Sequence, residues 1–399
     1  MLPGGQPAPA SGPRQAWVDN LRTAMIAAVV WMHAAVTFSH LGDWYQLASA
    51  APATWERALF ALGQSHLQAF FMGLLFLLSG LFADGALARR GPWRFLGERT
   101  RRLLGPTALY VAAINPLIYL VLLRPWWTRE GFSWGSWLAA YFLQVEVLAR
   151  TGPLWFCVAL WLFVAAWLGL RQVRPASPGP SPRPVPGLAV VGAAALALGL
   201  VTFAVRLVQP IGTSVLNLQL PFFPQYVAAF AVGVVAGRHR WLERAPVGAC
   251  RRLIALALGL GLPLWLATVW LNGTSDEAVG RLGGGWHGAA LAYAVWEQWF
   301  GALFGLGLAL LARDRWNRAG PRLAAVNANS FRVYVVHAPV LIALTPLAEA
   351  APGGALVRSL LLAASTWVLC VLLCEFGLRW LPGVRRSSQS PAAHGTDRP

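Results

Sequence analysis

Ten long apolar stretches constrain this sequence more than any other feature. A helix needs about 20 mostly apolar residues to cross a bilayer, and the stretches approach or exceed that length. Only 12% of the residues are charged, against about 25% in a soluble domain. We therefore predict an all-α, polytopic transmembrane helix bundle of about ten spans, with a shorter interfacial helix over 134–148. The stretches lie at residues 20–40, 60–84, 103–123, 153–171, 187–207, 222–238, 251–271, 288–312, 328–348 and 355–380.

Arginine supplies all of the basic charge, because the sequence contains no lysine. The arginines gather in alternate loops, at 85–102, 171–183, 238–252 and 313–322, whereas the loops between them hold far fewer. Basic loops stay in the cytoplasm, so both termini are predicted to be cytoplasmic. A net charge of +17 could also indicate nucleic-acid binding. Topology explains it better, so the lipid bilayer is the expected partner, with no nucleic acid, in a multi-pass protein of the inner (cytoplasmic) membrane.

The remaining segments define the domain organisation. Residues 1–16 and 382–399 are predicted to be disordered tails on either side of one transmembrane domain, 17–381. Within that domain, the Pro- and Ser-rich segment 174–187 is predicted to be a flexible cytoplasmic linker. The four cysteines have no His or Cys partners at metal-ligand spacing, so we expect no metal site.

Three ionisable residues lie deep inside predicted spans. At about 1.5 Å per residue, His33, His337 and Glu297 lie roughly 18, 15 and 14 Å from the start of their helices, all near mid-membrane. Such residues are costly in lipid and indicate function by default, so a shared polar cavity is the simplest explanation. His33 is the most attractive partner for Glu297. Each residue also has a structural alternative. His33 could be a packing histidine, Glu297 a structurally paired carboxylate, and His337 a histidine that stabilises the kink at Pro339.

Three arginines lie nearer the cytoplasmic side than these ionisable residues. Arg22 lies eleven residues before His33, so the two share one helix face to within about 20°. Arg99 and Arg102 flank the start of the third helix. Arginine binds phosphate bidentately, which would suit a phosphorylated ligand such as coenzyme A. All three arginines could instead serve only as positive-inside anchors.

These motifs together resemble the acyltransferase-3 family of membrane-bound O-acyltransferases, over residues 17 to about 380. The nearest branch contains the glucan biosynthesis protein that succinylates periplasmic glucans. That branch usually has Arg-Met after the histidine of the second helix, where this chain has Leu67 and Gln68. The resemblance rests on the Arg-x10-His spacing of Arg22 and His33, HLQAFFMGLLFLLSGLFA from His66, the Arg-x-x-Arg pair Arg99 and Arg102, GPLWF at Gly152–Phe156, and NSFRVYVVHAPV at Asn329–Val340.

The resemblance implies an enzyme that transfers an acyl group, acetyl or succinyl, from cytoplasmic acyl-CoA to a hydroxyl of a glycan or another envelope or secreted acceptor. Acyl-CoA would be a co-substrate, with no bound cofactor. His33 would be the general base, and Arg22, Arg99 and Arg102 would bind the donor. Glu297, which would orient the tautomer of His33, and His337 are added to the catalytic residues mainly because of their depth in the membrane.

A proton-coupled secondary transporter using buried His and Glu is the leading alternative, and a catalytically dead scaffold of the same fold is another. The sequence leaves open the acceptor, the acyl group, an acyl-enzyme route, the oligomeric state, and whether Glu297 or His337 is directly catalytic.

Overall fold

A computed structural model describes residues 15–123, 131, 133–143, 145–174 and 183–377. The part of the chain that it describes is built from helices, and its only β-type pairing is an isolated bridge between Val215 and Leu218. Ten helical runs among these residues are long and apolar enough to cross a membrane, which confirms the predicted bundle. They are α1 (Ala16–Ser39), α2 to α4 (Thr54–Arg90), α5 to η2 (Pro92–Leu123), η5 to α8 (Gly152–Val173), α9 (Leu188–Arg206), η6 to α10 (Leu220–His239), α12 (Ala249–Asn272), α14 (Gly288–Arg315), α15 (Pro321–Ala350) and α16 to η7 (Ala355–Gly377).

Several of these runs consist of shorter elements, and further short helices lie between the runs. The elements are α2 (Thr54–Gln68), α3 (Phe71–Leu81), α4 (Ala83–Arg90), α5 (Pro92–Leu109), η1 (Tyr110–Ile114), α6 (Asn115–Leu117), η2 (Ile118–Leu123), α7 (Trp134–Phe142), η4 (Val145–Ala149), η5 (Gly152–Leu154), α8 (Trp155–Val173), η6 (Leu220–Phe222), α10 (Phe223–His239), α11 (Trp241–Arg244), α13 (Asp276–Gly283), α16 (Ala355–Leu372) and η7 (Leu373–Gly377).

Most of the predicted tails and linker lies outside the described residues. These are 1–14, 175–182 and 378–399. The described residues at the margins show α1 beginning at Ala16 and an extended segment leading into α9.

The basic segment 85–102, which we expected to be a loop, is largely helical. Helix α4 continues through Arg90, and α5 begins at Pro92, well before the apolar stretch that starts at 103. Gly91 makes the sharp turn between them with a φ of 73°, a value that glycine adopts at little cost. Proline is favoured in the first turn of a helix because that turn has no partner for its N–H. Sequence hydropathy locates the membrane-spanning part of such a helix but not its polar extension.

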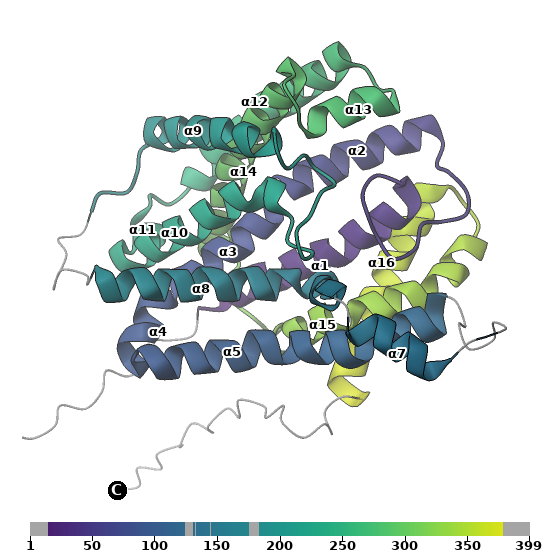
Figure 1. Cartoon of the computed structure of the whole chain (residues 1–399). Helices are drawn as coiled ribbons and strands as arrows, with labels where there is room; N and C mark the ends of the chain where they lie inside the picture. The colour runs from purple at the N-terminus through teal and green to yellow at the C-terminus, as the bar shows by residue number, and fades with distance from the viewer. Residues whose placement is uncertain (1–14, 124–130, 132, 144, 175–182, 378–399) are drawn as a thin grey trace, which may run out of the picture.

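Helix α1 runs through the middle of the bundle and packs against α2, α3, α14, α15 and α16 (Figure 1). Its apolar residues point in all directions, and Leu21, Val30, Ala34 and Ala35 are fully buried. A helix that is apolar all round belongs in the interior. The polar side chains in the middle of α1 therefore lie inside the protein rather than against lipid.

Close backbone packing joins α3 to α10. A Cβ added to Gly80 would meet the backbone of Phe230 and Val234, and one added to Gly233 or Gly237 would meet the backbone of α3. Small residues at a helix interface allow this approach in membranes. The Ser-Gly that ends the second apolar stretch is therefore a packing site.

The two ends of the bundle differ in charge. Asp84 of α4 bonds to Arg238 of α10 at 2.6 Å and lies 3.7 Å from Arg171 of α8, so three elements meet at what we call the arginine-rich end. The opposite end, here the loop end, carries α13 and the segments 40–53, 207–219 and 273–287. In Figure 1 α4 and α11 lie at one side of the bundle, and α13 lies at the other.

Cysteine labelling tests which end is cytoplasmic. Val208 at the loop end is 79% exposed and Val247 at the arginine-rich end is 87% exposed. The four native cysteines are buried, which keeps the background low. A membrane-impermeant maleimide should label Val208→Cys in intact cells and Val247→Cys only after permeabilisation. Labelling of both from one side would contradict the predicted topology.

Candidate active site

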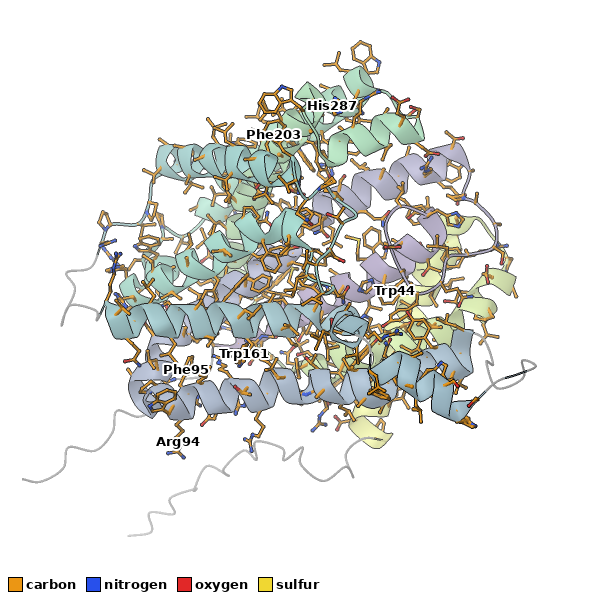
Figure 2. The ribbon with its side chains drawn as sticks, viewed as in Figure 1. Trp44, Arg94, Phe95, Trp161, Phe203 and His287 are labelled. Atoms are coloured by element: carbon orange, nitrogen blue, oxygen red, sulfur yellow. The ribbon has the colours of Figure 1, made fainter. Side chains whose placement is uncertain are left out.

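The two intramembrane histidines of α1 and α15 lie together. The ring centroids of His33 and His337 are 5.3 Å apart with nearly parallel planes. Trp44, from the loop after α1, stacks on His33 at 3.7 Å, and the ring of Tyr334 lies 5.8 Å from His337 (Trp44 is labelled in Figure 2). Four aromatic rings from three segments thus form one group, in which Trp44 carried no recognisable signal in the sequence.

Hydrogen bonds orient His337. Its Nδ1 lies 2.7 Å from the backbone oxygen of Tyr334. A carbonyl oxygen can only accept, so Nδ1 donates, and the neutral ring keeps Nε2 as a free acceptor. That atom is buried without a partner in the structure. Tyr334 is held in turn, because its hydroxyl donates to the backbone oxygen of Pro153. The ring of His337 is therefore fixed beside His33.

His33 itself is only partly buried and lines a cavity of about 780 Å³. Most of the wall comes from α1, α2, the segment 211–222, α12 and α13, so the cavity lies in the loop half of the bundle. The segment 41–43 and single residues or pairs of α3, η5, α8, α14 and α15 also contribute to the wall. Such a volume is typical of a site for a small molecule. A ligand that entered from the loop end could reach the imidazole.

The GPLWF motif, Gly152–Phe156, packs next to the aromatic group around His33. Gly152 adopts a φ of 50°, and a Cβ there would lie 2.5 Å from the hydroxyl of Tyr45 and 2.6 Å from the ring of Tyr110. The Tyr45 hydroxyl donates to Asn115 at 2.7 Å, and burial raises the pKa of this phenol well above its ordinary value. The glycine therefore lets the loop that carries Pro153 lie against the tyrosines next to Trp44.

The expected pairing of Glu297 with His33 is corrected by the structure. Glu297 Oε2 bonds instead to Arg206 Nη2 at 2.6 Å and to Gln298 Nε2 at 3.0 Å. Both members of the ion pair are buried, and Arg206 also donates to the backbone oxygen of Pro221. A buried carboxylate needs its charge compensated, and an arginine does this more completely than a neutral imidazole. The signal that sequence reasoning missed was Arg206 at the end of the fifth apolar stretch.

Several arginines gather at the other end of α1. Arg99 lies within electrostatic range of Arg22, Arg90 and Arg102, with Glu98 as the acidic neighbour. Its guanidinium also lies 5.4 Å from the centre of the Phe95 ring. Arg22 contacts Asp19 at 3.4 Å. The structure thus brings together the three arginines that the sequence singled out, at a position suited to a multiply charged anion.

The helix α1 connects this arginine cluster to the histidines. Arg22 and His33 are eleven residues apart on it, or about 16 Å. The line from arginines to histidines continues into the cavity on the far side of His33. One helix therefore carries an arginine near one end and, eleven residues further on, a histidine that faces a cavity.

Comparison with known proteins decides the family. The sequence matches the acyltransferase-3 family, described as an acyltransferase domain, over residues 15–375. The chain belongs to the acyltransferase-3 family. This acyltransferase domain extends from α1 almost to the end of η7 and contains every site residue named above. No curated protein matches the chain.

Membership in the family identifies the protein as a membrane-bound acyltransferase. Of the function classes that the sequence left open, it supports the enzyme over the proton-coupled transporter. The bundle of ten apolar helices agrees with a multi-pass protein that acts at a lipid bilayer.

Proposed function

We propose that this acyltransferase moves a short acyl group, acetyl or succinyl, from cytoplasmic acyl-CoA to a hydroxyl on an acceptor at the outer side of the inner membrane. A glycan or another envelope or secreted molecule would be the acceptor. The observation that carries the proposal is the placement of His33 between the arginine cluster and the cavity. Donor and acceptor could approach it from opposite ends.

The donor would bind with its phosphates at Arg22, Arg99 and Arg102. Coenzyme A carries several phosphate charges, and guanidinium groups bind phosphate in two-pronged pairs. Its long flexible arm would run along α1 and bring the thioester toward His33, about 16 Å away. The phosphates would remain near the arginine-rich end, so that only the neutral arm and the acyl group would enter the bundle.

His33 would then act as the general base. It would take the proton of the acceptor hydroxyl while that oxygen attacks the thioester carbonyl carbon. A C–O bond forms, the C–S bond breaks, and coenzyme A leaves as a thiol with the proton that His33 accepted. Histidine suits both steps, because it exchanges protons near neutral pH. His337 and Trp44, which pack on the His33 ring, would hold it in position.

Neutralising the donor arginines tests the binding half of this proposal. The double variant Arg99→Gln/Arg102→Gln should raise the apparent KM for acyl-CoA by about tenfold or more, because a charge-assisted hydrogen bond contributes about 1.5–3 kcal/mol. The value of kcat should change much less, since these contacts exist in the ground state and the transition state alike. The measurement is acyl transfer by purified protein across a range of acyl-CoA concentrations.

Arg94→Gln is the matched control. Arg94 lies on the same helix, but it is exposed and points away from the bundle (Figure 2). The KM of the Arg94→Gln variant for acyl-CoA should stay at the wild-type value. An unchanged KM in the double variant, together with a fall in correctly inserted protein, would show that Arg99 and Arg102 serve topology alone.

A further inference from the structure

The cavity beside His33 has exposed lining residues at the loop end, and it also has exposed apolar ones on one side of the bundle. Leu59 of α2 and Leu266 of α12 both line it, yet they are 48% and 51% exposed. Leu59 lies five residues from the loop end of α2, and Leu266 lies six residues from the loop end of α12, so each is about 8–9 Å inside the span. We call the gap between these two leucines the side opening. Leu266 lies within the apolar stretch 251–271 and Leu59 directly precedes the stretch 60–84, so the side opening lies near the loop-end edge of the predicted membrane spans.

An ion pair joins α2 to α13 at the loop end of this opening. Arg57 of α2 bonds to Asp276 of α13 at 2.5 Å. Figure 1 shows α13 lying next to α2 there. Between this pair and the cavity, the exposed apolar side chains of Leu59, Leu266 and Val279 form the border. The most direct apolar route into the cavity is therefore sideways, beneath the ion pair.

The cavity wall is poor in charge. Among the described residues that line it, only Asp43 and Arg57 carry full charges, and Arg57 is already paired. The deeper wall is formed by apolar side chains and by neutral polar ones such as Gln64, Gln68 and Tyr293. An anionic ligand would lose its hydration here without gaining a free cationic partner, because Arg57 is already paired. The wall therefore favours a neutral molecule over an anionic one.

Gln64 supplies a hydrogen-bond acceptor for the head of that molecule. Its side chain lines the cavity and is 7% exposed. Its Nε2 donates to the backbone oxygen of Leu41 at 3.1 Å, which fixes the orientation of the amide. The Oε1 atom is left buried with no partner in the structure. A hydroxyl donor from a ligand would satisfy this oxygen.

We propose that the acceptor is a neutral amphiphile, with a hydroxyl-bearing head and an apolar tail, that enters from the bilayer through the side opening between α2 and α12. This rests on the proposed function, because it assigns a chemical class to the acceptor of the same site. The head lies against Gln64 and His33, and the tail extends between Leu59 and Leu266 toward the lipid. The acceptor is thus taken from the membrane rather than from the aqueous phase.

Photolabelling in lipid nanodiscs tests the proposal without relying on catalysis. The probe is an alkyl glucoside with a diazirine in its tail, and the corresponding alkyl glucuronide is its anionic counterpart. The glucoside should label peptides of α2 and α12 saturably, and about tenfold or more strongly than the glucuronide does. Leu266→Trp, which fills the side opening, should reduce this labelling severalfold.

Leu264→Trp is the matched control. Leu264 lies on the same helix and is 52% exposed, but it does not line the cavity. The glucoside should label the Leu264→Trp variant as strongly as the wild type. Equal labelling by the two probes, or labelling that Leu266→Trp leaves unchanged, would overturn the proposal. His33→Ala separates the two hypotheses, because it should lose transfer while the glucoside, still held by Gln64 and by the contacts of its tail, continues to label α2 and α12 saturably. Full transfer by that variant would count against the proposed function and leave the side opening in place.

Discussion

Replacing His33 with alanine should lower the rate of acyl transfer by about 10²–10⁴, because a positioned general base contributes that much to a proton-transfer step. The side chain faces the cavity, and no other ionisable group of α1 does so among the described residues. The measurement is the transfer of labelled acyl groups by purified protein in nanodiscs. Binding of acyl-CoA should remain at the wild-type level, because the arginine cluster is about 16 Å away along the helix.

His287→Ala is the control for this experiment. His287 is exposed at the start of α14 and lies outside the cavity (Figure 2), so its rate should stay unchanged. His337→Ala should cost less than His33→Ala, because His337 packs beside the base instead of facing the cavity. Wild-type transfer by the His33 variant would remove the general base from the mechanism.

Breaking the Arg206–Glu297 pair should destabilise the protein by about 3–5 kcal/mol, since either partner alone leaves an uncompensated charge inside the bundle. Arg206→Met and Glu297→Gln should therefore both lower the midpoint of thermal unfolding in detergent. The double variant Arg206→Met/Glu297→Met should recover much of the loss, because removing both charges also removes the desolvation penalty. The midpoints are compared in one detergent at one protein concentration.

Glu277→Gln provides the surface comparison. Glu277 pairs with Arg281 at 3.1 Å, but its side chain is 85% exposed, and such pairs contribute about 0–1 kcal/mol. Its unfolding midpoint should hardly move. A stable, well-inserted Glu297→Gln variant that had lost acyl transfer would contradict the structural role and return Glu297 to the chemistry.

The aromatic group around His33 illustrates how far the sequence predicted the site. It placed His33, His337 and Glu297 near mid-membrane and expected one shared polar cavity. The two histidine rings do lie together in the structure, but of the three residues only His33 lines the cavity. It did not identify Trp44, because a tryptophan in a loop looks the same whether it packs on lipid, on a neighbouring helix or on a histidine. GPLWF could be assigned only by family resemblance, since its partners Tyr45, Tyr110 and Tyr334 come from other parts of the chain.

The sequence by itself determined the features that depend on local physics. Each membrane span follows from its own length and apolarity, and Arg22 and His33 share a face because one helix holds both. The tertiary structure decided which side chains meet. Glu297 forms an ion pair with Arg206, 91 residues earlier, because a buried carboxylate is stabilised by whichever cationic partner the packing brings within reach. The cavity likewise exists only where several segments distant in the sequence leave space between them, which no single segment encodes.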